Sequence, residues 1–171
     1  MKRATTGFAV TMAFGLAVQL AALAANLSPQ DQKFIKEAAQ GGMAEVMLGK
    51  MADEKGVHVE VRKFGEMMVN DHSRANKQLK ELATEKGVRL PTEVGPQHKA
   101  LAARLEKLSG SEFDRTYMQE MVKDHEKDVK EFQKEAESGR DVDIKKWASK
   151  TLPTLQMHLK MANETAAKLV N

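Results

Sequence analysis

Apolar residues recur every three or four positions along most of the chain, a spacing typical of amphipathic α-helices. Ser28 is a good N-cap and Pro29 suits the first helical position, so the first segment has a clear start. Gly56 and Gly87 are suited to end the first two segments. The pattern predicts an all-α protein with long helices over about residues 29–55, 59–86, 112–137 and 142–169, and a short helix over about 98–108.

The lengths of the predicted connections decide how these helices are arranged. The first two and the last two long helices are joined by only a few residues, so each pair must form an antiparallel hairpin. The connection over residues 87–111 is long enough to return along the bundle before the third long helix begins. The second and third long helices can then run parallel, as in a ferritin-like four-helix bundle with one long crossover.

An internal repeat supports this arrangement. Residues 64–72 and 117–125 share an aromatic residue followed by Met-Val-x-Asp-His at the same offsets, and both segments lie near the middle of their helices. In parallel helices the two Asp-His pairs would lie at one level of the bundle. Chance convergence of two core patterns is the alternative interpretation.

The N-terminal segment has the pattern of a secretory signal peptide. Lys2 and Arg3 precede an uncharged apolar run, and Ala22-Leu23-Ala24 supplies the small residues required for cleavage. An uncleaved anchor is the alternative, because the run is only slightly shorter than the roughly 20 apolar residues of a membrane span. We expect residues 1–24 to be a signal peptide and residues 25–171 to be a single four-helix-bundle domain in the bacterial periplasm, without a stable membrane span after processing.

The composition limits the kinds of partner that the chain can be expected to bind. The formal net charge of +3 falls to about +1 once Lys2 and Arg3 are removed. Basic and acidic residues alternate without a basic block and aromatic residues are few, so nucleic-acid binding is not expected. The chain has no cysteine, which excludes disulfides and a lipid-modified cysteine. A homo-oligomer is possible, and the sequence points to no particular protein partner.

Four polar residues occupy positions on the apolar stripes of the four long helices, each close to the middle of its helix. A carboxylate and imidazoles that converge from facing helices could bind a transition-metal ion such as Zn, Fe, Cu or Mn. Two aspartates next to the histidines in sequence could orient the rings as hydrogen-bond acceptors. The predicted metal ligands are His72, His125, His158 and Glu45, and the predicted supporting residues are Asp71 and Asp124.

Other interpretations of these residues remain open. The histidines and the glutamate could form a polar layer that fixes helix register and binds nothing, or could bind a small polar ligand. Methionines are numerous, and thioethers are soft ligands for Cu(I), although methionine at helical spacing is more often flexible core filler. Met68 and Met121, one turn before two of the histidines, are the methionines best placed for such a role.

The ordered motifs at residues 42–46, 68–72, 122–125 and 152–159 resemble the bacterial exported family catalogued as domain of unknown function 4142. The resemblance covers essentially the whole mature chain. It implies a ferritin-like protein, often labelled an outer-membrane or periplasmic protein, without an established activity. Ferritin-like di-iron proteins carry Glu-x-x-His on two helices, but the residues three before the histidines here are Val69, Val122 and Leu155. Di-iron chemistry is therefore not expected.

These observations lead to one main hypothesis. The chain is predicted to be an exported bundle that binds a single transition-metal ion for metal handling or stress tolerance. The alternative is a non-enzymatic structural or interaction bundle whose polar layer only fixes packing. The sequence has no glycine-rich phosphate loop, nucleophile elbow or cysteine pair, so hydrolase and nucleotide chemistry are not expected. An oxidoreductase is the third candidate.

Overall fold

The computed structural model describes residues 27–169, so the predicted signal peptide lies outside the described residues. All regular structure within residues 27–169 is helical. Each helix lies within two residues of its predicted bounds. The short helix begins and ends two residues early, since Pro96 fits its first turn, and the third long helix also begins two residues early. The helices are α2 (Pro29–Lys55), α3 (Val59–Glu85), α4 (Pro96–Glu106), α5 (Gly110–Ser138) and α6 (Val142–Lys168).

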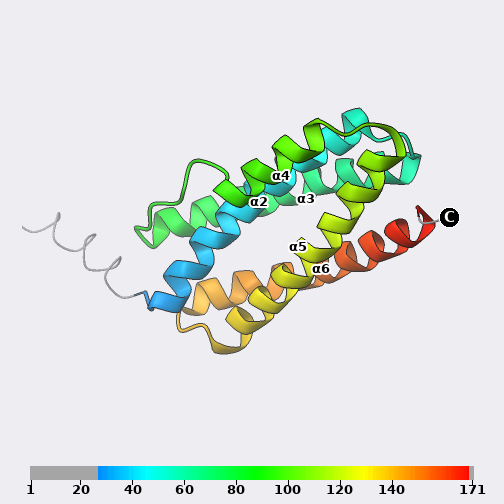
Figure 1. Cartoon of the computed structure of the whole chain (residues 1–171). Helices are drawn as coiled ribbons and strands as arrows, with labels where there is room; N and C mark the ends of the chain where they lie inside the picture. The colour runs from blue at the N-terminus through cyan, green and yellow to red at the C-terminus, as the bar shows by residue number, and fades with distance from the viewer. Residues whose placement is uncertain (1–26, 170–171) are drawn as a thin grey trace, which may run out of the picture.

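The four long helices pack as a bundle of two hairpins. α2 packs along α3 and α5 packs along α6, while α2 also contacts α5 and α3 contacts α6. These contacts place α3 and α5 on opposite corners of the bundle. Figure 1 shows that α3 and α5 run in the same direction, because the connection through α4 returns along the bundle and lies against α2 and α5. The predicted direction of the crossover is therefore confirmed.

Polar side chains fix the ends of the helices near the chain start. Ser28 and Asp31 form a capping box at the beginning of α2. Asp31 is fully buried and also accepts a hydrogen bond from the backbone N–H of Arg140, at 2.9 Å, in the turn between α5 and α6. This single carboxylate therefore ties the start of the first hairpin to the turn of the second.

Two hydrophobic clusters fill the bundle. One contains Phe64, Met68 and Tyr117 with their neighbours, and the other contains Phe34 and Trp147 with theirs. The buried Glu45, His72, His125 and His158 belong to neither cluster, and their positions along the helices place them between the two. A polar layer therefore crosses the middle of an otherwise apolar core.

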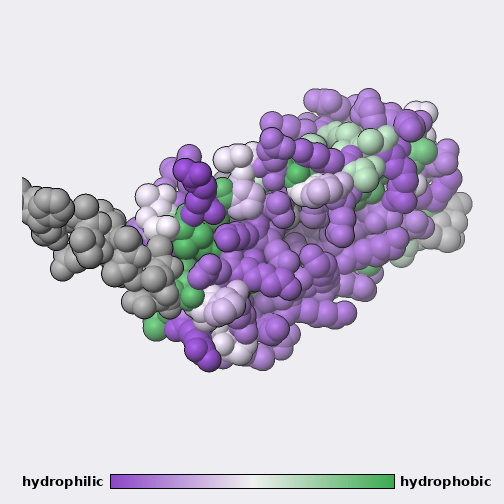
Figure 2. Space-filling view, turned by 60° about the vertical axis from the view of Figure 1, so that its left-hand side comes forward, coloured by the Kyte–Doolittle hydropathy of each residue, from purple (hydrophilic) through white to green (hydrophobic). Residues whose placement is uncertain are grey.

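The surface is dominated by charged and polar side chains. The face drawn in Figure 2 is mainly hydrophilic, with small separate apolar areas. None of the helices among the described residues is both long enough and apolar enough to cross a membrane.

Two glycines allow α2 and α3 to approach closely at the level just beside the polar layer. A Cβ atom placed on Gly65 would lie 2.5 Å from the carbonyl oxygen of Gly49 and 2.9 Å from the Cβ of Ala52. Neither neighbour can yield easily, since one is backbone and the other is a methyl group in the core. The contact therefore sets the distance between α2 and α3.

We expect Gly65→Ala to destabilise the protein by roughly 2 kcal/mol, because the added methyl group pushes the two helices apart. Gly41→Ala is the matched control, because no atom lies within 4 Å of the position that its methyl group would take. That control should gain about 0.5–1 kcal/mol from the higher helix propensity of alanine. Urea unfolding followed by circular dichroism measures both values, and equal effects of the two variants would contradict the proposed close contact.

Candidate metal centre

Three histidines from three different helices meet in the polar layer. His72 comes from α3, His125 from α5 and His158 from α6, and each offers one ligand atom within 4.8 Å of the others. All three side chains are buried. The centroids of neighbouring rings are 5.4 to 5.9 Å apart. The sequence prediction that these histidines converge is therefore matched by their positions.

Hydrogen bonds to two of the rings determine which nitrogen is free. His125 Nδ1 lies 2.9 Å from the carbonyl oxygen of Met121, which can only accept, so Nδ1 carries the hydrogen. His158 Nε2 lies 3.0 Å from Oδ2 of Asp71 and donates to that carboxylate. Each ring consequently has a lone pair on its other nitrogen.

The free nitrogens are also the atoms without partners. Nε2 of His72, Nε2 of His125 and Nδ1 of His158 are buried and have no hydrogen-bond partner. Burying an unpaired polar group costs about 1–3 kcal/mol. Each of the three clustered rings therefore has one buried nitrogen without a partner, which is an unusual feature of a core. A ring nitrogen with a free lone pair is the atom that binds a metal ion.

The spacing of the group is close to that of a metal site. If the three ligand atoms formed a triangle with sides at the 4.8 Å limit, its centre would be about 2.8 Å from each atom. Bonds from imidazole nitrogen to zinc are about 2.0–2.1 Å long. Small side-chain movements of less than about 1 Å would therefore bring the three nitrogens to bonding distance.

The surroundings keep the rings neutral. Burial lowers the pKa of His72 well below its usual value, and the neighbouring His125 and His158 lower it further. Burial also lowers the pKa of His125, and it lowers that of His158 to about 4 despite the opposing hydrogen bond to Asp71. Neutral imidazole is the form that binds metals, so the rings are ready to act as ligands at neutral pH.

Glu45 lies in the same layer, but beside the Nδ1 edge of the His125 ring rather than beside the unpaired Nε2. Its Oε1 is 3.9 Å from Nδ1 of His125, whereas the free lone pair of this ring is on Nε2. Glu45 is not a member of the three-histidine group. Burial raises its pKa to about 8, and the negative charge of Asp124 adds to the increase. Glu45 is thus placed beside a candidate ligand, and its role as a ligand stays a prediction.

The repeat explains this arrangement. Exchanging α3 with α5 and α2 with α6 leaves the order of helix neighbours in the bundle unchanged and pairs His72 with His125. In this exchange Glu45 of α2 corresponds to His158 of α6. Asp71 bonds to His158, but its counterpart Asp124 has a buried, unpartnered Oδ2 and a pKa raised chiefly by burial. Of the two predicted supporting residues, Asp71 therefore contacts a histidine of the group through a hydrogen bond.

The sequence interpretation missed one acidic residue near the layer. Asp128 lies one turn after His125 on α5, and burial together with the charge of Glu45 raises its pKa to about 7. Its spacing of three residues from His125 was the available signal, because residues three apart share a helix face. The hydroxyl of Tyr117 is also buried without a partner, and the pKa of this residue is raised by burial and by Glu45.

The fold and the centre define a class of protein: an all-helical bundle with three histidines buried in its middle. The chain belongs to the family described as Domain of unknown function (DUF4142), whose model matches residues 16–165. The family resemblance seen in the sequence is therefore confirmed.

Two solved structures have a similar fold. The first is a DUF305 fragment from Deinococcus radiodurans, with a TM-score of 0.73 and 15% identity, covering 83% of this chain and 98% of the fragment. The second is described as CopM in the Cu(II)-bound form, with a TM-score of 0.68 and 17% identity, covering 81% of this chain and 96% of CopM. No curated protein matches the chain. At these identities the two structures establish the shared fold.

The raised pKa of Glu45 predicts a specific dependence of stability on pH. The folded state holds this proton up to about pH 8, whereas an ordinary glutamate loses it near 4.5, so its contribution to stability is present below 4.5 and is lost as pH rises to 8. Glu45→Gln removes this contribution. Between pH 5 and 8, the metal-free wild type should lose on the order of 2 kcal/mol more unfolding free energy than the variant.

Urea unfolding at a series of pH values measures this difference. Glu54→Gln, on the exposed face of the same helix, is the control and should follow the wild-type profile. Parallel profiles for wild type and Glu45→Gln would contradict the buried, protonated glutamate.

Proposed function

We propose that this chain is an exported, ferritin-like bundle that binds one transition-metal ion through His72, His125 and His158. The observation that carries this proposal is the compact group of three buried histidines, each of which has one ring nitrogen without a hydrogen-bond partner. A metal ion would satisfy all three lone pairs together. The long crossover and the parallel α3 and α5 support the ferritin-like description.

The donor set favours some ions over others. Three neutral imidazoles suit zinc and copper, while carboxylate-rich sites suit manganese and the di-iron centres of ferritin-like proteins. Glu45 lies at the far edge of His125, where a carboxylate supports a ligand ring more readily than it binds the same ion. CopM, which has the same fold, is described in a Cu(II)-bound form, and this supports copper as the first ion to test.

Three protein ligands also suggest how the ion is used. A tetrahedral ion with three ligands keeps one position for water or an exchangeable ligand, whereas purely structural zinc sites usually have four protein ligands. Such a centre suits reversible binding and handling of metal. The signal-peptide pattern of residues 1–24 supports a periplasmic location for this activity.

A purely structural polar layer is the competing function. The hydrogen bond between His158 and Asp71 and the one between His125 and the Met121 carbonyl would also fix helix register without any ion. The two functions differ in one measurable property, because only a metal-binding protein is stabilised by adding the ion.

Replacing two of the ligands should remove metal binding. We expect His72→Ala/His125→Ala to lower the affinity for Zn²⁺ and Cu²⁺ at least a hundredfold, because a single imidazole remains in the group. His98→Ala, a histidine of α4 outside the group, should stay within twofold of wild type. Isothermal titration of the protein after treatment with a chelator gives both affinities.

The same samples separate the two candidate functions. Added Zn²⁺ or Cu²⁺ should raise the thermal unfolding temperature of wild type and of His98→Ala but not that of the double variant. Wild-type protein that binds neither ion and gains no stability from it would reject the metal centre and leave the structural layer.

The carboxylate of Asp71 should be required for tight binding, because its hydrogen bond holds the His158 ring in the tautomer with a free Nδ1. We expect Asp71→Asn to weaken Zn²⁺ binding about 10- to 100-fold. Asp53→Asn, on an exposed position of α2, is the control. An affinity of Asp71→Asn within twofold of wild type would show that this hydrogen bond does not support the centre.

A further inference from the structure

Three methionines of α3 and α6 take no part in the histidine centre, and their helix positions place them along the groove where these two helices meet. Met157 and Met161 on α6 are 45% and 37% exposed, although methionine is usually a core residue. Met67 on α3 is partly buried against the neighbouring hydrophobic cluster. We propose that Met67, Met157 and Met161 form a second metal site, specific for Cu(I), on the outside of the bundle beside the histidine centre.

The register of α3 against α6 places these residues together. The hydrogen bond between Asp71 and His158 fixes the level at which the two helices meet. Because α3 and α6 run in opposite directions, one turn toward the start of α3 leads to Met67, and one turn toward the end of α6 leads to Met161. Met67 and Met161 therefore occupy neighbouring levels of the two helices, one turn from the hydrogen bond.

The helix faces agree with this placement. Arg74 and Gln78 of α3 and Lys150 and Thr154 of α6 line a shallow hollow between the two helices on the other side of Asp71. Met67 lies seven residues before Arg74, and Met161 lies seven residues after Thr154, so each continues its helix face by two turns. The helix positions of Met67 and Met161 therefore continue the two faces that line this hollow.

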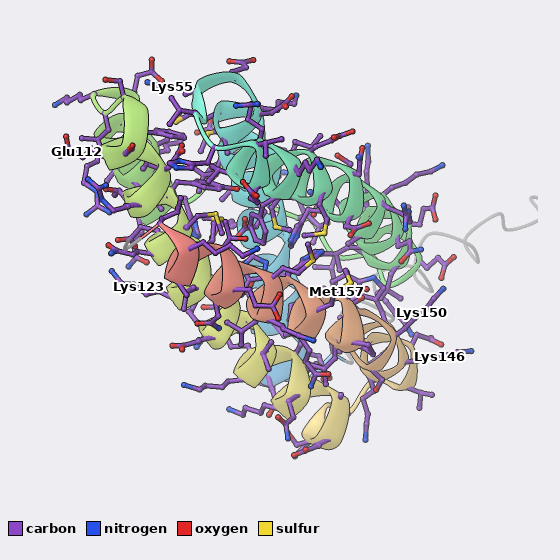
Figure 3. All side chains as sticks on the ribbon, turned by 90° about the vertical axis from the view of Figure 1, so that its right-hand side faces the viewer. Lys55, Glu112, Lys123, Lys146, Lys150 and Met157 are labelled. Atoms are coloured by element: carbon purple, nitrogen blue, oxygen red, sulfur yellow. The ribbon has the colours of Figure 1, made fainter. Side chains whose placement is uncertain are left out.

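Met157 completes the set. It lies four residues before Met161, a spacing that brings two side chains on a helix surface into contact. In Figure 3, sulfur atoms are drawn between the α3 and α6 ribbons beside the labelled Met157. The helix spacing thus brings three flexible thioethers from two helices to this groove.

The chemistry of these side chains selects the ligand. Thioethers are soft, uncharged donors that bind Cu(I), and they bind hard or borderline ions such as Mn²⁺ and Zn²⁺ poorly. The Asp71 carboxylate between the two helices is already paired with Arg74, at 3.6 Å, and with His158, so the thioethers supply the attraction for the ion. The groove therefore suits a soft monovalent cation, while the three imidazoles inside suit a borderline divalent ion.

The methionine site does not depend on the histidine centre, so the two proposals can be tested and rejected independently. The variants to compare are Met67→Leu/Met157→Leu/Met161→Leu, the histidine double variant His72→Ala/His125→Ala, and Met43→Leu. Methionine to leucine conserves volume and should leave the fold intact, which circular dichroism checks. Met43 lines a cavity between α2 and the segment after α3, away from the groove, so its variant controls for loss of any methionine.

The measurement is anaerobic titration of the purified protein with Cu(I) against a competing chelator. We expect the triple leucine variant to lose Cu(I) affinity at least tenfold and to bind Zn²⁺ like wild type. Met43→Leu should retain wild-type Cu(I) affinity, and the histidine double variant should retain Cu(I) binding in the groove.

Methyl resonances of isotope-labelled methionine provide a second test that does not depend on variants. On addition of Cu(I), or of Ag(I) as a redox-stable substitute, the signals of Met67, Met157 and Met161 should shift in both wild type and the histidine double variant. Unshifted signals at these three residues, or wild-type Cu(I) affinity in the triple leucine variant, would overturn the proposal.

Discussion

The layer of buried imidazoles is the constraint to which the rest of the bundle is fitted. It lies between two apolar clusters and contains three ring nitrogens without partners, at a cost of about 1–3 kcal/mol each. Apolar side chains of similar size in these positions would avoid that cost. The carbonyl of Met121 accepts a hydrogen bond from one nitrogen of His125, and the carboxylate of Asp71 accepts one from a nitrogen of His158. The other nitrogen of each of these two rings stays unpaired.

The two halves of the bundle differ at one position, which makes the layer asymmetric. His72 and His125 hold matching positions of the repeat, but α6 contributes His158 where α2 contributes Glu45. Asp71 therefore faces an imidazole that can donate to it, whereas Asp124 faces another acid, whose pKa it raises. As a result the three imidazoles form one compact group and the carboxylic acid of Glu45 stays at its margin.

Much of this arrangement could be predicted from the sequence. Capping residues and glycines determine where each helix begins and ends, and the length of the crossover determines that α3 and α5 are parallel. With both known, the height of each histidine along the bundle followed from its position in its helix. The periodicity could not show which edge of His125 faces Glu45, because that depends on side-chain rotation and on the carbonyl of Met121. The periodicity also predicted the same supporting role for Asp71 and Asp124. Their roles differ because Asp71 faces a histidine on its neighbouring helix, whereas Asp124 faces a glutamate.

Charge places a further condition on any ion held in this layer. Three neutral imidazoles contribute no charge, so a divalent ion among them needs compensation from nearby groups. Glu45, Asp124 and Asp128 are acids near His125. Burial raises the pKa of all three, to about 8 for Glu45 and about 7 for Asp128, so a nearby cation would shift each of them toward its ionised form. A positive charge in the group favours their ionised forms. The position of Glu45, at the outer edge of a candidate ligand ring, therefore suits a supporting carboxylate whose charge appears when the ion is present.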